Sequence, residues 1–115
     1  MSLYTVRKIH DLLTDKKCDS SKMCGTLAYV TVPSDKAIEA ADSENIEAMK
    51  KLKYDDIWER QDTLEPKIGY TVVFHSTKFD AGWFGTSCVC SYITLPSGDV
   101  EITTNNSIYL CRIKK

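Results

Sequence analysis

A chain of 115 residues, of which 43% are hydrophobic and 27% charged, has the length and composition of one ordinary globular domain, which excludes a disordered or fibrous protein. Fifteen Lys and Arg against 16 Asp and Glu give a formal net charge of -1, which excludes the bulk attraction on which sequence-independent nucleic-acid binders depend. No apolar run approaches the ~20 residues of a membrane span, and the N-terminus has charged residues in place of the apolar region of a signal peptide. We therefore expect a single domain, 1–115, in the cytoplasm, with no membrane partner.

Five cysteines are a high count for this length. The number is odd, and an intracellular protein keeps its thiols reduced. Cys88 and Cys90 are expected on one face of a strand as small buried side chains, with Val89 opposite. Cys18 and Cys24 are the pair that could close a local disulfide or contribute to a metal site. Neither pair has the spacing of a zinc site, so no metal is predicted.

The N-terminal half, residues 1–65, is predicted to be mainly helical with one strand. Apolar positions recur at helical spacing through Thr5–Lys16, with charged side chains on the other side, which predicts an amphipathic helix. A strand is predicted over Thr26–Val32, because this run is rich in β-branched residues and ends at Pro33, which cannot donate to a sheet ladder.

Two capping residues divide the segment that follows this strand. Ser34 is suited to cap a short helix beginning near Asp35, and Ser43 to cap a second helix that ends in the basic residues at 50–53. A single longer helix from Ser34 is the alternative. Tyr54–Glu65 shows no clean period, so a short helical turn and a loop are expected there.

The C-terminal half, residues 66–115, is predicted to be mainly β. Pro96–Asp99 is a strong turn signal, and Asn105–Asn106 lies where a two-residue hairpin would need positive φ angles. The last three strands are therefore expected to form an antiparallel meander. The candidate strands are Ile68–His75, Ser87–Leu95, Val100–Thr104 and Ser107–Ile113. The whole chain is thus predicted to be an α+β protein, in which two or three helices from the N-terminal half pack on an antiparallel sheet or a small barrel.

A series of short motifs runs through the segment from Leu64 to Ile113. The series consists of Leu64, Ile68-Gly69, the strand Tyr70–Phe74, Asp80-Ala81-Gly82, Trp83-Phe84-Gly85, the Gly98 turn and Ile108-Tyr109-Leu110. The order of these features resembles that of a small SH3-like barrel. The resemblance implies that Trp83 lines a groove for proline-rich peptides. The chain lacks the Ala-Leu-Tyr-Asp-Tyr segment and the closing Pro-x-x-Tyr of SH3 domains, so an open sheet covered by helices remains the alternative.

Aromatic residues gather at a glycine-containing corner between the predicted strands Ile68–His75 and Ser87–Leu95. Exposed Trp and Tyr are enriched at protein interfaces, where they supply large contact areas at low entropy cost. Our first hypothesis is therefore a non-enzymatic protein-binding or modulator domain, a class that includes phage accessory proteins. Trp83 could instead cover the open end of the sheet. The predicted contact residues are Phe79, Asp80, Trp83, Phe84, Trp58 and Tyr109.

The second hypothesis is a nucleic-acid or nucleotide-binding domain, although the net charge argues against this partner. Bases would stack on Trp83 and Phe84, with Lys67, Lys78 and Arg112 nearby.

The third hypothesis is a Cys-His enzyme. It requires the strand that ends at His75 to pair with the strand of Cys88 and Cys90, with Asp80 orienting the imidazole ring. No family signature surrounds these residues, and both cysteines are expected in the core. No catalytic residue and no cofactor are therefore predicted.

Overall fold

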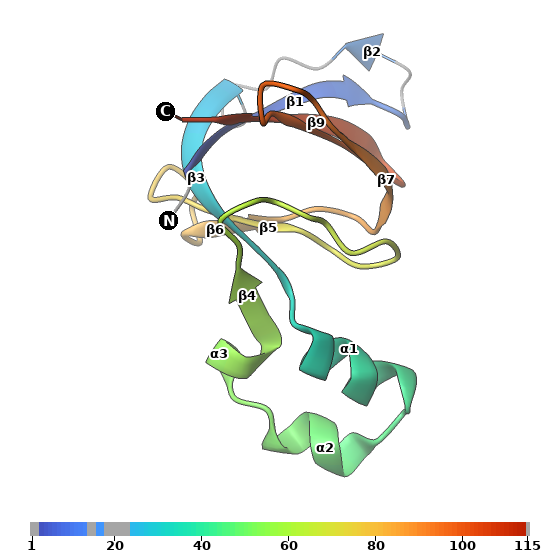
Figure 1. The fold of residues 1–115 in the computed structure, drawn as a ribbon. Helices are drawn as coiled ribbons and strands as arrows, with labels where there is room; N and C mark the ends of the chain where they lie inside the picture. Colours follow the sequence, from blue (N-terminus) through green and yellow to red (C-terminus); the bar gives the residue numbers. More distant parts are fainter. Residues whose placement is uncertain (1–2, 14–15, 18–23, 115) are drawn as a thin grey trace.

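The computed structural model describes residues 3–13, 16–17 and 24–114. Its main feature is an antiparallel sheet that curls around a core, with the strand order β6-β5-β3-β1-β9-β8-β7 (Figure 1). Two short strands lie off this path, since β2 pairs with β1 and β4 pairs with β3. The strands are β1 (Tyr4–Asp11), β2 (Lys16–Lys17), β3 (Cys24–Pro33), β4 (Trp58–Arg60), β5 (Val73–His75), β6 (Trp83–Gly85), β7 (Val89–Thr94), β8 (Val100–Thr104) and β9 (Ser107–Ile113).

The sheet is open, with β6 and β7 as its edge strands. The predicted antiparallel sheet is confirmed, but the closed barrel implied by the SH3-like resemblance is not observed in the described residues. Backbone hydrogen bonds nevertheless tie the segment before β5 to the start of β7. The Gly69 N–H donates to the Val89 carbonyl (2.8 Å), and the Val89 N–H donates to the Tyr70 carbonyl (2.9 Å).

A hydrophobic core fills the inside of the curl. Buried side chains alternate with more exposed ones along the strands, as expected for a sheet with one packed face and one solvated face. On β3, Val30 is 2% exposed, whereas its neighbour Tyr29 is 36% exposed. We call the side of the sheet turned away from the core the outer face. The largest fully buried side chains are Tyr4, Phe74, Leu64 and Ile102.

The segment Thr5–Lys16, predicted to be an amphipathic helix, contains most of strand β1 instead. β1 lies in the middle of the sheet and pairs with β3 on one side and β9 on the other. Val6 is buried between the more exposed Thr5 and Arg7, which is the two-residue period of a strand. The helical prediction was wrong because pairing with two strands distant in sequence outweighs local periodicity.

Three short helices follow β3: α1 (Asp35–Asp42), α2 (Ile46–Lys51) and α3 (Tyr54–Ile57). The predicted cap is confirmed, since the Ser34 side chain accepts a hydrogen bond from the Ala37 N–H (3.1 Å). The second helix is capped by Asn45, which accepts from the Ala48 N–H (3.1 Å). Ser43, predicted for that role, ends α1 instead. Two helices are therefore present in place of the alternative single helix.

The three helices gather at one end of the sheet and leave its faces uncovered (Figure 1). The Ser34 N–H donates to the Ile57 carbonyl (2.7 Å), which joins the start of α1 to the end of α3. Strand β4 then returns along the end of β3, with Pro33 opposite Trp58. We call the segment 34–57 the helical unit. No helix in the described parts of the chain has the length and apolar character needed to cross a membrane.

The predicted meander of the last three strands is confirmed. Gly98 has φ 92° in the turn between β7 and β8, where its N–H donates to the Leu95 carbonyl (2.9 Å). The expected positive φ angles at Asn105–Asn106 are not found. The Thr104 hydroxyl closes that turn instead, because it accepts from the Ser107 N–H (3.1 Å) and donates to the Ser107 carbonyl (2.9 Å).

The predicted strand Ile68–His75 is shorter than expected, and only Val73–His75 forms β5. A turn interrupts it, in which Gly69 has φ 87° and the Tyr70 N–H donates to the Lys67 carbonyl (3.1 Å). The aromatic corner also differs from the prediction, because Trp83–Gly85 is itself a strand, β6, paired with β5.

Candidate functional site

Three ring-bearing side chains line up across the outer face of β3, β5 and β6. Tyr29 pairs with His75, and His75 pairs with Trp83, so the three residues form one cross-strand row. The adjacent row, Val30, Phe74 and Phe84, turns toward the core. Because successive residues of a strand point to opposite faces, the buried row holds the other row on the outside. We call Tyr29, His75 and Trp83 the aromatic row.

Side-chain contacts of Tyr29 and His75 define the geometry of two of the three members of the aromatic row. The rings of Tyr29 and His75 stack with centroids 4.4 Å apart and an interplanar angle of 3°. His75 Nε2 lies 2.8 Å from the Thr31 hydroxyl on β3. The Arg60 guanidinium carbon lies 4.3 Å from the centroid of the Tyr29 ring, within cation–π range. Arg60 comes from β4, so four strands contribute to this one surface.

The charge of this surface comes from Arg60 rather than from His75. Partial burial, and then the nearby positive charge of Arg60, lower the pKa of His75 below its ordinary value of 6.5. The imidazole is therefore neutral near pH 7. Arg60 Nε is buried and makes no hydrogen bond within the described part of the chain. The aromatic row thus combines neutral rings with one fixed cation.

Trp83 is the most exposed member of the row, at 54%. Its indole lies over Gly85, since a Cβ atom built on Gly85 would be 3.4 Å from Trp83 Cζ3. A Cβ atom at position 85 would therefore be in van der Waals contact with the ring. The indole thus lies along the sheet, over Gly85, and presents a large apolar surface on the outer face.

The structure separates the six predicted contact residues. Trp83 and Asp80 are exposed, as expected. Phe79 and Tyr109 are core residues, with 6% and 3% exposure, and cannot serve as contact residues while the fold is intact. Phe84 is half-buried and packs against both, with ring centroids 5.9 Å from Phe79 and 6.3 Å from Tyr109. The predicted exposure is therefore not found for Phe79 and Tyr109, and is found only in part for Phe84.

Trp58 lies apart from the aromatic row. It lines an apolar hollow of about 230 Å³ between the helical unit and the turn before β5. Polar contacts close the same junction, because Lys67 Nζ pairs with Asp35 Oδ1 (3.0 Å) and the Tyr70 hydroxyl donates to Asp42 Oδ1 (2.5 Å). Trp58 therefore helps to hold the helical unit against the sheet.

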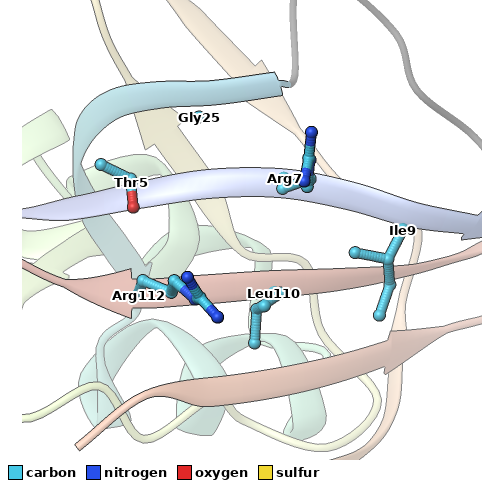
Figure 2. Close-up of a pocket in the computed structure, with 6 residues that line it drawn as sticks. All are labelled: Thr5, Arg7, Ile9, Gly25, Leu110 and Arg112. Atoms are coloured by element: carbon cyan, nitrogen blue, oxygen red, sulfur yellow. The ribbon is translucent and has the colours of Figure 1, made fainter.

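A second feature of the outer face is a groove of about 360 Å³ across β1, β3 and β9 (Figure 2). It carries two arginines, and the Arg112 Nε lies 3.9 Å from the Asp99 carboxylate. Leu27 is 38% exposed and lies on β3 between the groove and the aromatic row. The lining residues are Thr5, Arg7, Ile9, Gly25, Leu110 and Arg112.

The cysteines are not placed as predicted. Cys88 and Cys90 are exposed, whereas Val89 between them is buried, so the burial pattern is the reverse of the expected one. Cys90 lies on β7 and Cys88 directly before it, and Cys90 Sγ lies 3.0 Å from Asn105 Oδ1. Burial raises the pKa of the Cys111 thiol far above its ordinary range. The proposed pair of Cys18 and Cys24 cannot be placed within the described structure. Cys18 lies outside the described residues, and only the backbone of Cys24 is described.

The strand pairing required for a Cys-His site is contradicted. The strand of His75 pairs with β3 and β6, whereas the strand that contains Cys90 pairs with β8. Thr31 and Tyr29 occupy the surroundings of the imidazole instead. Across residues 3–13, 16–17 and 24–114, no group of three or more His, Cys, Asp or Glu side chains could hold a metal ion.

No family model, curated protein or solved structure matches this chain. The site must therefore be interpreted from its own geometry.

Proposed function

We propose that this protein is a non-enzymatic binding module, and that its outer face contacts a protein partner through the aromatic row. The observation that carries the proposal is the cross-strand alignment of Tyr29, His75 and Trp83, two of which remain substantially exposed. Aromatic side chains with fixed orientation supply most of the binding energy in many interfaces, because little side-chain entropy is lost on contact.

The surroundings of the row support recognition of a protein. Arg60 adds a cation against the Tyr29 ring, and Arg is the charged residue most enriched at interface hot spots. Thr31 and His75 add polar groups beside the rings. A protein surface that offers an apolar side chain next to a carbonyl or carboxylate would match this combination of rings, cation and polar groups.

Affinity capture with matched variants tests the proposal. The full chain, Trp83→Ala and Ile46→Ala would be immobilised separately and exposed to an extract of the cells that produce the protein. Ile46 is a stringent control, because it is apolar and 66% exposed but lies on α2, away from the aromatic row. We expect Trp83→Ala to lose a partner that the other two proteins retain. An identical set of captured proteins from all three would contradict the proposal.

Single-stranded nucleic acid is the second candidate ligand, because Trp83 offers an exposed ring on which a base can stack and Arg60 a cation on the same face. Two residues expected to help are committed elsewhere, since Lys67 pairs with Asp35 and Phe84 packs on the core. This candidate predicts an affinity that falls steeply with salt concentration. Titration with oligothymidine at low and high salt distinguishes it from protein binding.

A further inference from the structure

The groove of Figure 2 contains two cations that the aromatic row does not use. Arg7 on β1 pairs with Leu110 on β9, and Thr5 pairs with Arg112, so the two arginines are diagonal neighbours on the outer face. Diagonal neighbours of an antiparallel pair have Cβ atoms about 7–8 Å apart, a gap that long side chains can span. Both guanidinium groups can therefore reach one ligand in the groove.

We propose that this groove binds a carboxylate-bearing, extended peptide segment of the partner; this inference rests on the proposed function. The guanidinium group presents planar, forked N–H donors that match the two oxygens of a carboxylate. Each arginine carries five N–H donors, so a contact already present in the fold, such as that of Arg112 with Asp99, leaves donors for a ligand.

The apolar residues of the groove favour a peptide with alternating side chains. Ile9 and Leu110 line the groove together with the arginines, and Leu27 is exposed on the adjacent strand. An extended segment turns successive side chains in opposite directions. The side chains that face the sheet can thus be acidic beside the arginines and apolar further along, where they cover Leu27, while the side chains between them point away.

The groove and the aromatic row lie on one continuous path along β3. Gly25 lines the groove and Tyr29 belongs to the aromatic row, so four steps along one strand separate them. At about 3.3 Å per residue this distance is roughly 13 Å, which a short extended peptide can cover. One partner segment can therefore contact both features.

The charges around the groove favour separate carboxylates over a continuous phosphate backbone. Asp99 pairs with Arg112, and Glu101 lies opposite Leu110 on β8. These two acids would repel a polyphosphate that runs along the sheet. The net charge of -1 offers no compensating long-range attraction. A peptide whose acidic residues are interrupted by neutral ones carries fewer negative charges past these two acids and is therefore repelled less.

The test is a titration of the full, isotope-labelled chain with a short peptide of alternating Glu and Val, monitored by amide chemical shifts. The matched peptide has Gln in place of Glu. We expect the acidic peptide to shift the amide signals of Gly25 and Leu110, and the Gln peptide to bind at least about tenfold more weakly. Arg7→Ala and Arg112→Ala should each weaken binding by about tenfold, whereas Lys36→Ala on α1 should leave it unchanged.

Three results would overturn the inference. The first is that millimolar acidic peptide leaves the amide signals of the groove residues unshifted, and the second is that the Gln peptide binds as tightly as the acidic one. The third is that oligothymidine binds more tightly than the peptide and depends on the same two arginines. Trp83→Ala separates this inference from the proposed function. The groove is supported as a separate subsite if the peptide no longer shifts the amide signals of the groove in the arginine variants but still shifts them in Trp83→Ala. Partner capture unaffected by Trp83→Ala would count against the aromatic row alone.

Discussion

His75 shows how a single residue links the fold to the candidate site. It stacks on Tyr29, contacts Thr31, and occupies the middle of the aromatic row. Its ring is kept neutral because burial and the charge of Arg60 both disfavour the imidazolium. Protonation would place a second positive charge beside Arg60, and would weaken the arrangement of the row.

We therefore predict that the free energy of unfolding decreases on acidification in a manner that depends on His75. The pKa of His75 is lower in the folded state than its ordinary value of 6.5, so the unfolded chain takes up the proton more readily. The contribution is fully present above about pH 6.5 and is lost as the pH falls from there toward the folded-state pKa. Urea denaturation at a series of pH values should show a smaller loss for His75→Gln than for the unmodified chain. Equal pH dependence of the two proteins would contradict the assignment.

The cysteines provide a second prediction at the scale of single residues. Iodoacetamide reacts with the thiolate form of accessible cysteines. Cys88 and Cys90 are exposed, whereas Cys111 is buried and its pKa is raised by that burial. Peptide mapping by mass spectrometry should find the first two alkylated in the native protein and Cys111 alkylated only after denaturation. Labelling of Cys111 at the same rate as Cys88 would show that β9 is not packed as described.

At the scale of the elements, the helical unit is held together by hydrogen bonds of one residue, Ser34. Ser34 caps α1 through the Ala37 N–H, and its hydroxyl also donates to the Asp56 carbonyl at the end of the unit. Its own N–H donates to the Ile57 carbonyl. Ser34 therefore joins the first and last helices of the unit.

Ser34→Ala should lower stability by about 1 kcal/mol, because the capped N–H groups of α1 lose their partner. Hydrogen exchange should become faster across residues 34–57 while the core strands keep their protection. Ser91→Ala, a similar change at an exposed position of β7, is the control and should leave exchange unchanged. Uniform acceleration over the sheet and the helices would argue against a separate role for this cap.

Only some of the elements were predictable from the sequence. The last three strands were predictable, because Pro96–Asp99 encodes a turn and the flanking residues alternate in polarity. Strand β1 was not predictable, because its apolar residues do not alternate: Val6 turns to the core, whereas Ile9 lines the groove on the outer face. Its pairing with β9, which brings Tyr4 opposite Ile113, joins segments that are distant in sequence. β4 and β6 have only three residues each, too few for a periodic signal.

The candidate site was predictable only in part, for a related reason. Trp83 stands out in the sequence because it lies among glycines and aromatic residues. Tyr29 and Arg60 do not stand out in the sequence. They come together only when β3, which precedes the helical unit in the chain, pairs with β4 and β5, which follow it. The period-two pattern of Thr26–Val32, with Tyr29 at an outward position, was the available signal.

At the scale of the whole molecule, the helices extend the structure beyond the sheet. The radius of gyration is 14.4 Å, somewhat above the roughly 13 Å expected for a compact chain of this length. Because the helical unit lies at one end, none of the described helices covers the outer face of the curled sheet (Figure 1). The aromatic row and the basic groove are both on that face, which makes it the surface we propose for the partner.

Site-specific photo-crosslinking tests this claim most directly. Benzoylphenylalanine would be incorporated in place of Tyr29 in one protein and in place of Ile46 in another, and both would be irradiated in extract of the producing cells. Both positions are exposed, but only Tyr29 belongs to the aromatic row. We expect a crosslinked partner from the Tyr29 position and none from the Ile46 position. The same products from both positions, or products from Ile46 alone, would contradict it.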